Sequence, residues 1–220
     1  RRSWSTDVLP SSLPIFPLPT VVLFPNVFLP LHIFEPRYRQ MVADALNGDR
    51  LIGMVLLKPG SDAEYDAKPP VYATGCMGLI THAEKLADGR YNLVLRGLDK
   101  FTIVGEEAPA PGQLYRRALV RAIDETVADA DRDTLKQERH RLEGLLTPLL
   151  DPALAENRLP KQMPDNDLVN ALAQYLDFEP IEKLALLERD GPLARCRSMV
   201  ELLEMKALLK KSAGDAGMVH

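Results

Sequence analysis

The apolar residues of this 220-residue chain change their spacing about halfway along its length. Up to about residue 123 they occur in short runs that Gly, Pro and Asp interrupt, a pattern typical of strands and turns. Runs of β-branched, aromatic and aliphatic residues predict strands over 27–33, 51–57, 74–82, 91–96, 101–105 and 115–123. This series of strands is sufficient for a small β-barrel.

Two local signals organise this half. In LADGRYNLVLRG, Asp88 and Gly89 favour a tight hairpin, and apolar residues then alternate with polar ones, which predicts one buried strand face. In IFEPRYRQMVADALNGD, Pro36 suits a first helical position, an apolar stripe runs from Met41 to Leu46, and Gly48 suits the end. A helix is therefore predicted among the strands.

Beyond Glu125 the apolar period becomes that of helices. ETVADADRDTLKQERHRLEGLLTPLL predicts a long amphipathic helix that ends near Pro148 and Pro152. Three shorter helices should follow: DLVNALAQYL capped by Asp165 or Asn166, IEKLALLERD opened by Pro180, and LARCRSMVELLEMKALLKK. Together these helices predict a bundle.

The predicted fold class is therefore α+β, with an N-terminal mixed β-barrel that carries an inserted helix and a C-terminal all-α helical bundle. The predicted divisions are a frayed or disordered lead-in over 1–12, the barrel over 13–123, the bundle over 124–212 and a tail over 213–220. The prolines of the stretch 13–38 predict an irregular, well-packed entry into the barrel.

Composition narrows the function classes. The chain has 27 Lys and Arg against 31 Asp and Glu, a formal charge of −4, so nucleic acid is an unfavoured partner. The two cysteines, Cys76 and Cys196, are far apart and lack metal-ligand spacing, which fits a reducing, cytoplasmic location. Prolines and charges interrupt every apolar run before it could span a bilayer, so no membrane association is expected.

Sequence signals for catalysis are absent. There is no GxxxxGK[ST] loop, and TGCMG lacks the spacing of a dinucleotide-binding turn, so no nucleotide cofactor is expected. The four histidines show no HExxH spacing and none is near a cysteine, so no metal site is predicted. No GxSxG elbow occurs, and the pairs Glu84–Lys85 and Glu106–Glu107 are typical surface charges. The chain is predicted to be no enzyme, with no catalytic residues.

Four segments carry a resemblance to a known family: LPIFPLPTVVLFPNVFLPLHIFEPRYRQMV, GCMGLI, DGRYNLVLRGLDKFTI and LYRRALVRAIDE. In this order and spacing they resemble the amino-terminal substrate-binding domain of the Lon protease family. The later stretch DLVNALAQYLDFEPIEKLALLERDGPLARCRSMVELLE is similar to the helical part that follows in that family. The resemblance implies that the barrel is of the PUA-like kind and that a helical bundle follows it.

One motif departs from the family pattern. The family hairpin usually reads Gly, any residue, Arg, Arg, Phe, whereas here Gly97 is followed by Leu98, Asp99, Lys100 and Phe101. A role that rests on the first arginine therefore does not carry over.

The resemblance implies a non-catalytic module that recognises unfolded or apolar polypeptide, or a specific protein partner. The sequence itself contains neither the ATPase nor the Ser-Lys protease module of that family. Two alternatives stay open: an RNA-binding PUA-like protein, and a regulatory partner of a separate ATPase or protease. A homodimer formed through apolar faces of the bundle is also compatible with the sequence.

Candidate binding residues come mainly from the stretch 13–38. Its aromatics are either core residues or the lining of an apolar groove, and the charged corner that follows is either a capping and salt-bridge cluster or a ligand contact. The candidates are Phe24, Phe28, Phe34, Glu35, Arg37 and Tyr38. Arg117 and Arg121 lie on one face of the last strand, where a solvated surface is favoured over contact with nucleic-acid phosphates.

Overall fold

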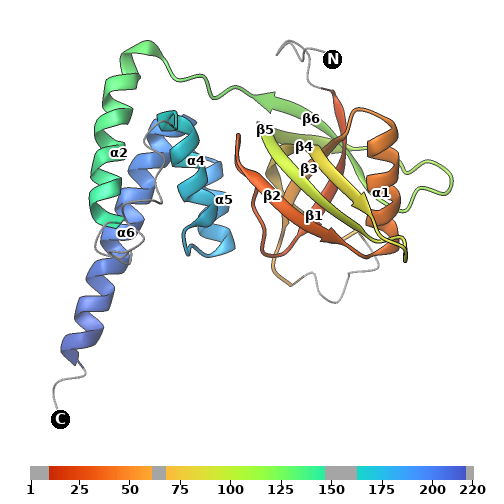
Figure 1. Ribbon diagram of the computed structural model, residues 1–220. Coiled ribbons are helices and arrows are strands. Elements are labelled where there is room, and N and C mark those ends of the chain that lie inside the picture. The colour runs from red at the N-terminus through yellow and green to blue at the C-terminus, as the bar shows by residue number, and fades with distance from the viewer. Residues whose placement is uncertain (1–9, 61–67, 147–162, 217–220) are drawn as a thin grey trace. The chain divides into compact units, whose positions relative to one another are not determined.

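The structure, a computed structural model, describes residues 10–60, 68–146 and 163–216 (Figure 1). The described chain forms two compact units. The first extends to Asp124 and also includes Asp177–Leu187, whereas the second holds the remaining described residues from Glu125 onward. The backbone therefore passes from the first unit to the second, returns once, and leaves again.

The first unit is built mainly from β-structure. Its elements are β1 (Ser12–Leu18), β2 (Phe28–Ile33), α1 (Pro36–Asn47), β3 (Leu51–Leu57), β4 (Val71–Lys85), β5 (Tyr91–Glu106), β6 (Arg117–Ile123) and α5 (Pro180–Leu187). The sequence predicted the segments 91–96 and 101–105 as two strands, but they are parts of the single strand β5.

The strands form one mixed sheet in the order β2-β5-β4-β3-β1-β6. The pair β1–β3 is parallel and the other pairs are antiparallel. Because β6 also pairs with β5, the pairings β5-β4-β3-β1-β6 close into a ring. Among the described strands, β2 pairs with β5 alone, so it forms an edge of the sheet.

Apolar side chains from most strands fill the interior of the first unit. Every residue of β3 is buried, which matches its almost continuous apolar sequence. A central cluster consists of Leu13, Ile15, Leu51, Val55, Met77, Phe101 and Ala118. Each large member stabilises the fold by roughly 1.5–3 kcal/mol relative to an exposed position.

Helix α1 is where the sequence places it. Pro36 lies in its first turn, and the backbone N–H of Gly48 donates to the carbonyl of Ala45 at its end. Tyr38, Met41, Val42 and Ala45 form its buried side. The predicted inserted helix is thus confirmed.

The prediction of an irregular, well-packed entry is right for residues 19–27, which form neither helix nor strand, but wrong for β1, which is regular despite Pro14 and Pro17. The backbone N–H of Ile15 donates to the carbonyl of Arg116, which directly precedes β6. Because the N–H groups of successive strand residues point to opposite sides, the backbone nitrogen of Pro17 faces β6 and that of Pro14 faces β3. The β1–β6 register ends at Pro14, and the β1–β3 register begins only at Ile15. Neither proline therefore costs a ladder hydrogen bond.

The second unit contains α2 (Arg132–Leu146), α4 (Asp165–Tyr175) and α6 (Gly191–Ala216), with a short 3₁₀ turn at Asp129–Asp131. The three helices pack on one another through the buried residues Leu135, Leu142, Leu146, Leu168, Val169, Ala173, Cys196, Met199 and Val200. Ion pairs connect α2 with α6 at Arg141–Glu204 (2.7 Å) and Arg197–Glu138 (3.2 Å), and Arg139 of α2 pairs with Asp165 of α4.

Three details of the helical region differ from the sequence prediction. Helix α5 belongs to the first unit, so the helices predicted over 124–212 do not form one continuous unit. Pro164 is the N-cap of α4, and Asp165 is already helical. Helix α6 continues to Ala216, into the predicted tail. The predicted helix end at Pro148 and Pro152 lies outside the described residues. No helix in the described chain is long and apolar enough to cross a membrane.

Candidate functional site

Three neighbouring strands present one outward surface, here called the β2 face. Because alternate strand residues point to opposite sides, residues two apart on each strand share this surface. The register pairs Phe28 with Arg96, Pro30 with Val94, and His32 with Asn92 across β2 and β5. On β4, His82 pairs with Val94, and Glu84 with Asn92. These eight residues define the β2 face.

An open groove of about 390 Å³ lies on the β2 face. Its lining residues are Pro30, Leu31, His32, His82, Asn92, Leu93 and Val94. Alternation places the side chains of Leu31 and Leu93 on the other side of the sheet, so Pro30 and Val94 supply the aliphatic side chains beside two imidazoles and one amide. A groove of this composition can bury aliphatic or aromatic side chains and offers a few polar groups to orient them.

Two exposed aromatic side chains lie along the strand that forms this groove. Phe28, the first residue of β2, is 52% exposed, and Phe34, just after its end, is 61% exposed. Six residues of extended chain separate them by about 20 Å. Large exposed aromatics next to an apolar groove are typical of binding surfaces.

The backbone edge of β2 is partly blocked. The N–H of Gly97 donates to the carbonyl of Val27. Because every second residue of an antiparallel strand bonds to the same neighbour, the backbone groups of Leu29, Leu31 and Ile33 form the hydrogen bonds to β5. The backbone groups of Phe28, Pro30 and His32 point the other way, toward the edge. Pro30 has no N–H, so a strand added here would find no donor at its centre.

A polar chain of contacts crosses one end of the β2 face. The Asn92 amide donates to Glu84 (3.3 Å), which turns the Asn92 oxygen toward His32 Nδ1 (2.7 Å). Arg90 Nη1 approaches His32 Nε2 at 3.4 Å, and Arg90 also pairs with Asp88 (2.6 Å). Since a guanidinium can only donate, Nε2 must accept, and Nδ1 therefore carries the proton.

The remaining candidates from the stretch 13–38 are buried or make contacts that stabilise the local fold. Phe24 is fully buried, so it belongs to the core. The Arg37 guanidinium donates to the Glu35 carboxylate (2.8 Å) and lies over the ring of Tyr38, 4.8 Å from its centroid. Tyr38 is buried and packs on Phe16 with ring centroids 4.4 Å apart. These contacts fix the turn from β2 into α1.

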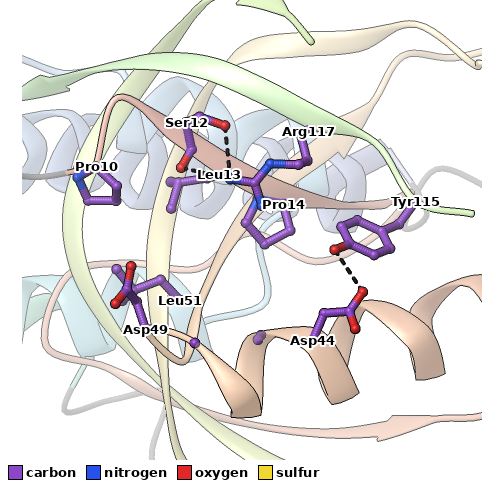
Figure 2. Close-up of a pocket in the computed structure, with 11 residues that line it drawn as sticks. Pro10, Ser12, Leu13, Pro14, Asp44, Asp49, Leu51, Tyr115 and Arg117 are labelled. Atoms are coloured by element: carbon purple, nitrogen blue, oxygen red, sulfur yellow. Dashed lines mark hydrogen bonds between the residues drawn. The ribbon is translucent and has the colours of Figure 1, made fainter. Parts of the chain in front are cut away.

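A second, smaller pocket of about 160 Å³ lies between β1 and α1 (Figure 2). In Figure 2 the Tyr115 hydroxyl points at Asp44 and donates to its carboxylate (3.0 Å), while Arg117 donates to the Ser12 hydroxyl (3.0 Å). Burial and the Asp44 carboxylate raise the pKa of Tyr115. These hydrogen bonds connect Tyr115, just before β6, with α1, and Arg117, the first residue of β6, with β1. The polar groups around the pocket therefore stabilise the fold.

The arginines of the last strand are mostly committed to carboxylates. Arg117 pairs with Glu107 (2.9 Å), and hydrogen bonds from Ser12 and Arg117 lower the pKa of Glu107. Arg116 pairs with Glu106. Arg121 is exposed on the same strand face as Arg117. Because two of these three cations are neutralised locally, the strand offers little positive charge to a polyanion.

Among the described residues, no group of three or more His, Cys, Asp or Glu side chains could hold a metal ion. Cys76 and Cys196 are both buried. Burial raises the pKa of Cys196 to about 12, so its thiol stays protonated and unreactive.

The sequence singles out Phe28 and Phe34 as candidates but does not indicate that Pro30, His32 and His82 share one surface. The alternation in FLPLHIF does place residues 28, 30, 32 and 34 on one side of a strand. What the sequence lacks is the strand order, which makes β2 an edge and brings His82 of β4 into the groove.

The mixed sheet, whose pairings close into a ring, and the separate helical unit define a two-unit α+β protein. The family model of the ATP-dependent protease La (LON) substrate-binding domain matches residues 12–205. The chain belongs to this family.

Two relatives carry the name Lon protease. The chain is 28% identical over 209 residues to Lon protease 2 of Myxococcus xanthus, covering 92% of this chain and 24% of the relative. It is 28% identical over 172 residues to Lon protease of Dictyoglomus thermophilum, covering 78% of this chain and 20% of the relative. The chain thus spans about a quarter or less of the length of these two relatives.

Solved structures share the fold. A Lon N-terminal domain protein from Xanthomonas campestris superposes with a TM-score of 0.59 at 24% identity, covering 87% of this chain and 98% of that one. The N-terminal domain of Mycobacterium avium complex Lon protease gives a TM-score of 0.63 at 18% identity, covering 88% and 98%. At these identities the match shows the fold alone.

Proposed function

We propose that this chain is a non-catalytic recognition module that binds extended apolar segments of unfolded polypeptide on the β2 face. The family supports the class of role, since its description is that of a substrate-binding domain. The observation that carries the placement is the combination of an apolar groove with Phe28 and Phe34 exposed along it.

Side chains, more than added backbone hydrogen bonds, would provide the affinity. Pro30 interrupts the row of donors on the β2 edge, which weakens pairing with a further strand. The apolar groove and the two phenyl rings instead offer area to the side chains of an extended segment. Such binding tolerates many sequences, as a module that recognises unfolded chains requires.

We further infer that the closed ring of strand pairings is a small barrel of the PUA-like kind and that α2, α4 and α6 form a helical bundle. The relatives are proteases of about four times this length. Delivery of a bound segment to an ATPase and protease, on the same chain or on another, is the corresponding role in proteolysis.

Fluorescence anisotropy with a labelled, carboxymethylated, permanently unfolded protein tests the proposal. The double variant Phe28→Ala, Phe34→Ala should weaken binding roughly tenfold or more, because both rings lose their contact area. Leu114→Ala is the matched control: this side chain is 58% exposed in the same unit but outside the β2 face. Equal affinity of the double variant and the control would exclude the β2 face.

A labelled single-stranded RNA serves as the second ligand. Under the proposal it binds weakly, and unlabelled RNA does not displace the polypeptide. An RNA affinity that falls steeply with salt and is lost in the double variant Arg117→Ala, Arg121→Ala would instead favour the RNA-binding alternative.

A further inference from the structure

Among the described residues that line the groove on the β2 face, only the two histidines are titratable; the rest of this lining is uncharged: Pro30, Leu31, Asn92, Leu93 and Val94. His32 comes from β2 and His82 from β4, with β5 between them. Both side chains are exposed, so solvent protons reach them. Imidazoles are the side chains whose charge ordinarily changes near neutral pH.

We propose that the β2 face is pH-sensitive: it binds an apolar segment while His32 and His82 are neutral, and proton uptake by them releases the segment. This inference rests on the proposed function, since it concerns regulation of the same groove. It assigns to the two histidines a role that neither packing nor metal binding accounts for.

Both ring nitrogens of His32 have partners at one end of the β2 face. Its Nδ1–H donates to Asn92, whose orientation Glu84 fixes, and its Nε2 accepts from Arg90. A proton on Nε2 would leave two cations facing each other at 3.4 Å, so Arg90 or the ring must move. The His32 ring also stacks on Phe34, with centroids 6.4 Å apart, so its displacement disturbs the exposed aromatic as well.

The surrounding charges are few and mostly paired. Asp88 pairs with Arg90 (2.6 Å), and Glu84 accepts from Asn92, which in turn contacts His32. Arg96, at the Phe28 end of the β2 face, donates to the Asn26 side chain (3.0 Å). His82 lies two residues before Glu84 on the same face of β4 and opposite the aliphatic Val94. The charge that appears in the groove on acidification is therefore chiefly that of the two imidazoles.

Linkage gives the direction of the effect. A bound apolar segment removes water from the groove, and an imidazolium without water or an acceptor is costly to bury. The segment therefore prefers the neutral imidazoles, and binding expels protons. Affinity should consequently fall as the pH falls, with no change in fold.

The test measures the dissociation constant of an acetylated, amidated peptide of alternating Phe and Ser residues, which carries no ionisable group, at about pH 7.5 and about pH 5.5. The label is a rhodamine whose fluorescence is constant over this range. For the unaltered protein we expect the dissociation constant to rise roughly fivefold or more on acidification.

The double variant His32→Asn, His82→Asn removes both titrations, and the amide introduced at position 32 can still donate toward Asn92. Its ratio of dissociation constants at the two pH values should be close to one. His140→Asn is the matched control, because His140 lies on α2 and contacts the Lys136 carbonyl at 2.6 Å; this variant should keep the ratio of the unaltered protein.

Binding with the same affinity at both pH values would overturn the pH inference and leave the proposed function intact. A pH dependence that survives in the double histidine variant would also overturn it. Absence of binding at either pH would remove the proposed function and the inference with it. Circular dichroism at both pH values shows whether the fold is retained.

Discussion

Gly97 shows how one residue can join two distant segments. Its N–H donates to Val27 and its carbonyl accepts from Asn26, whose own backbone has a positive φ of 59°. A Cβ at position 97 would lie 1.9 Å from the Phe24 carbonyl oxygen, which is main chain and cannot rotate away. The close approach that places β2 beside β5 therefore requires glycine.

The variant Gly97→Ala should consequently lower the free energy of unfolding by about 3 kcal/mol, as overpacking against a backbone does. Gly105→Ala is the control on the same strand, because its Cβ would meet only Leu119 at 3.5 Å; we expect a change within about 0.5 kcal/mol. Urea denaturation of both variants provides the measurement. Equal stability of the two would mean that segment 24–27 can move freely.

Tyr115 contributes to stability in a pH-dependent manner. Burial and Asp44 raise the pKa of its hydroxyl in the folded chain, so the unfolded chain loses the phenolic proton first as the pH rises. The contribution is therefore present below the ordinary tyrosine pKa of about 10 and is lost as the pH rises through the higher folded-state value.

For Tyr115→Phe we expect a loss of about 1 kcal/mol at neutral pH, because the hydrogen bond to Asp44 is removed. The variant should also lose less stability than the unaltered protein between about pH 9.5 and about pH 11. Guanidinium denaturation across this range checks both expectations. A parallel decline of the two proteins would show that another group dominates the alkaline transition.

At the scale of elements, the sequence predicted most strands and helices but little of their pairing. Leu51–Leu57 and the helix after Pro36 follow from continuous burial and from a helical stripe, which are local signals. β1 was missed because local propensity counts Pro14 and Pro17 against a strand. Only the register shows that their missing N–H groups face no partner.

The candidate site was predicted in part for the same reason. Phe28 and Phe34 are prominent in the sequence and are exposed in the structure, whereas the equally prominent Phe24 is buried. Which aromatic points outward depends on the edge position of β2 and on the turn that Gly97 holds. Neither can be read from a single strand's sequence.

Pro30 should protect the β2 edge against pairing with other molecules. Pro30→Thr supplies the missing N–H on the exposed edge and a residue with high strand propensity, so we expect increased self-association at high protein concentration. Pro111→Thr, in an exposed turn, is the control and should behave like the unaltered protein. Light scattering distinguishes the outcomes. A strictly unchanged mass for Pro30→Thr would show that the edge is protected by other means.

At the scale of the whole molecule, the second unit is anchored at its first residue. The fully buried Arg195 of α6 donates to Asn170 of α4 (2.5 Å) and to Glu125 (2.5 Å). Glu125 is where the chain enters this unit. One guanidinium thus joins two helices to the incoming chain.

Arg195→Met should lower the stability of the second unit by about 3 kcal/mol or more, because the Glu125 carboxylate then loses its buried partner. Arg132→Met removes an exposed pair with Asp129 and should change stability by less than about 0.5 kcal/mol. The loss of helical circular dichroism in urea reports on this unit. A similar midpoint for both variants would contradict the anchoring role.

Helix α5 has a consequence for the order in which the protein can be made. The helix belongs to the first unit and contacts β4, yet the ribosome produces it only after the chain of α2 and α4. The surface of β4 that contacts α5 therefore stays uncovered while part of the second unit emerges. Completion of the first unit during synthesis is thus set by a segment that arrives late, and a pause in translation before Asp177 would prolong the exposure of that surface to chaperones.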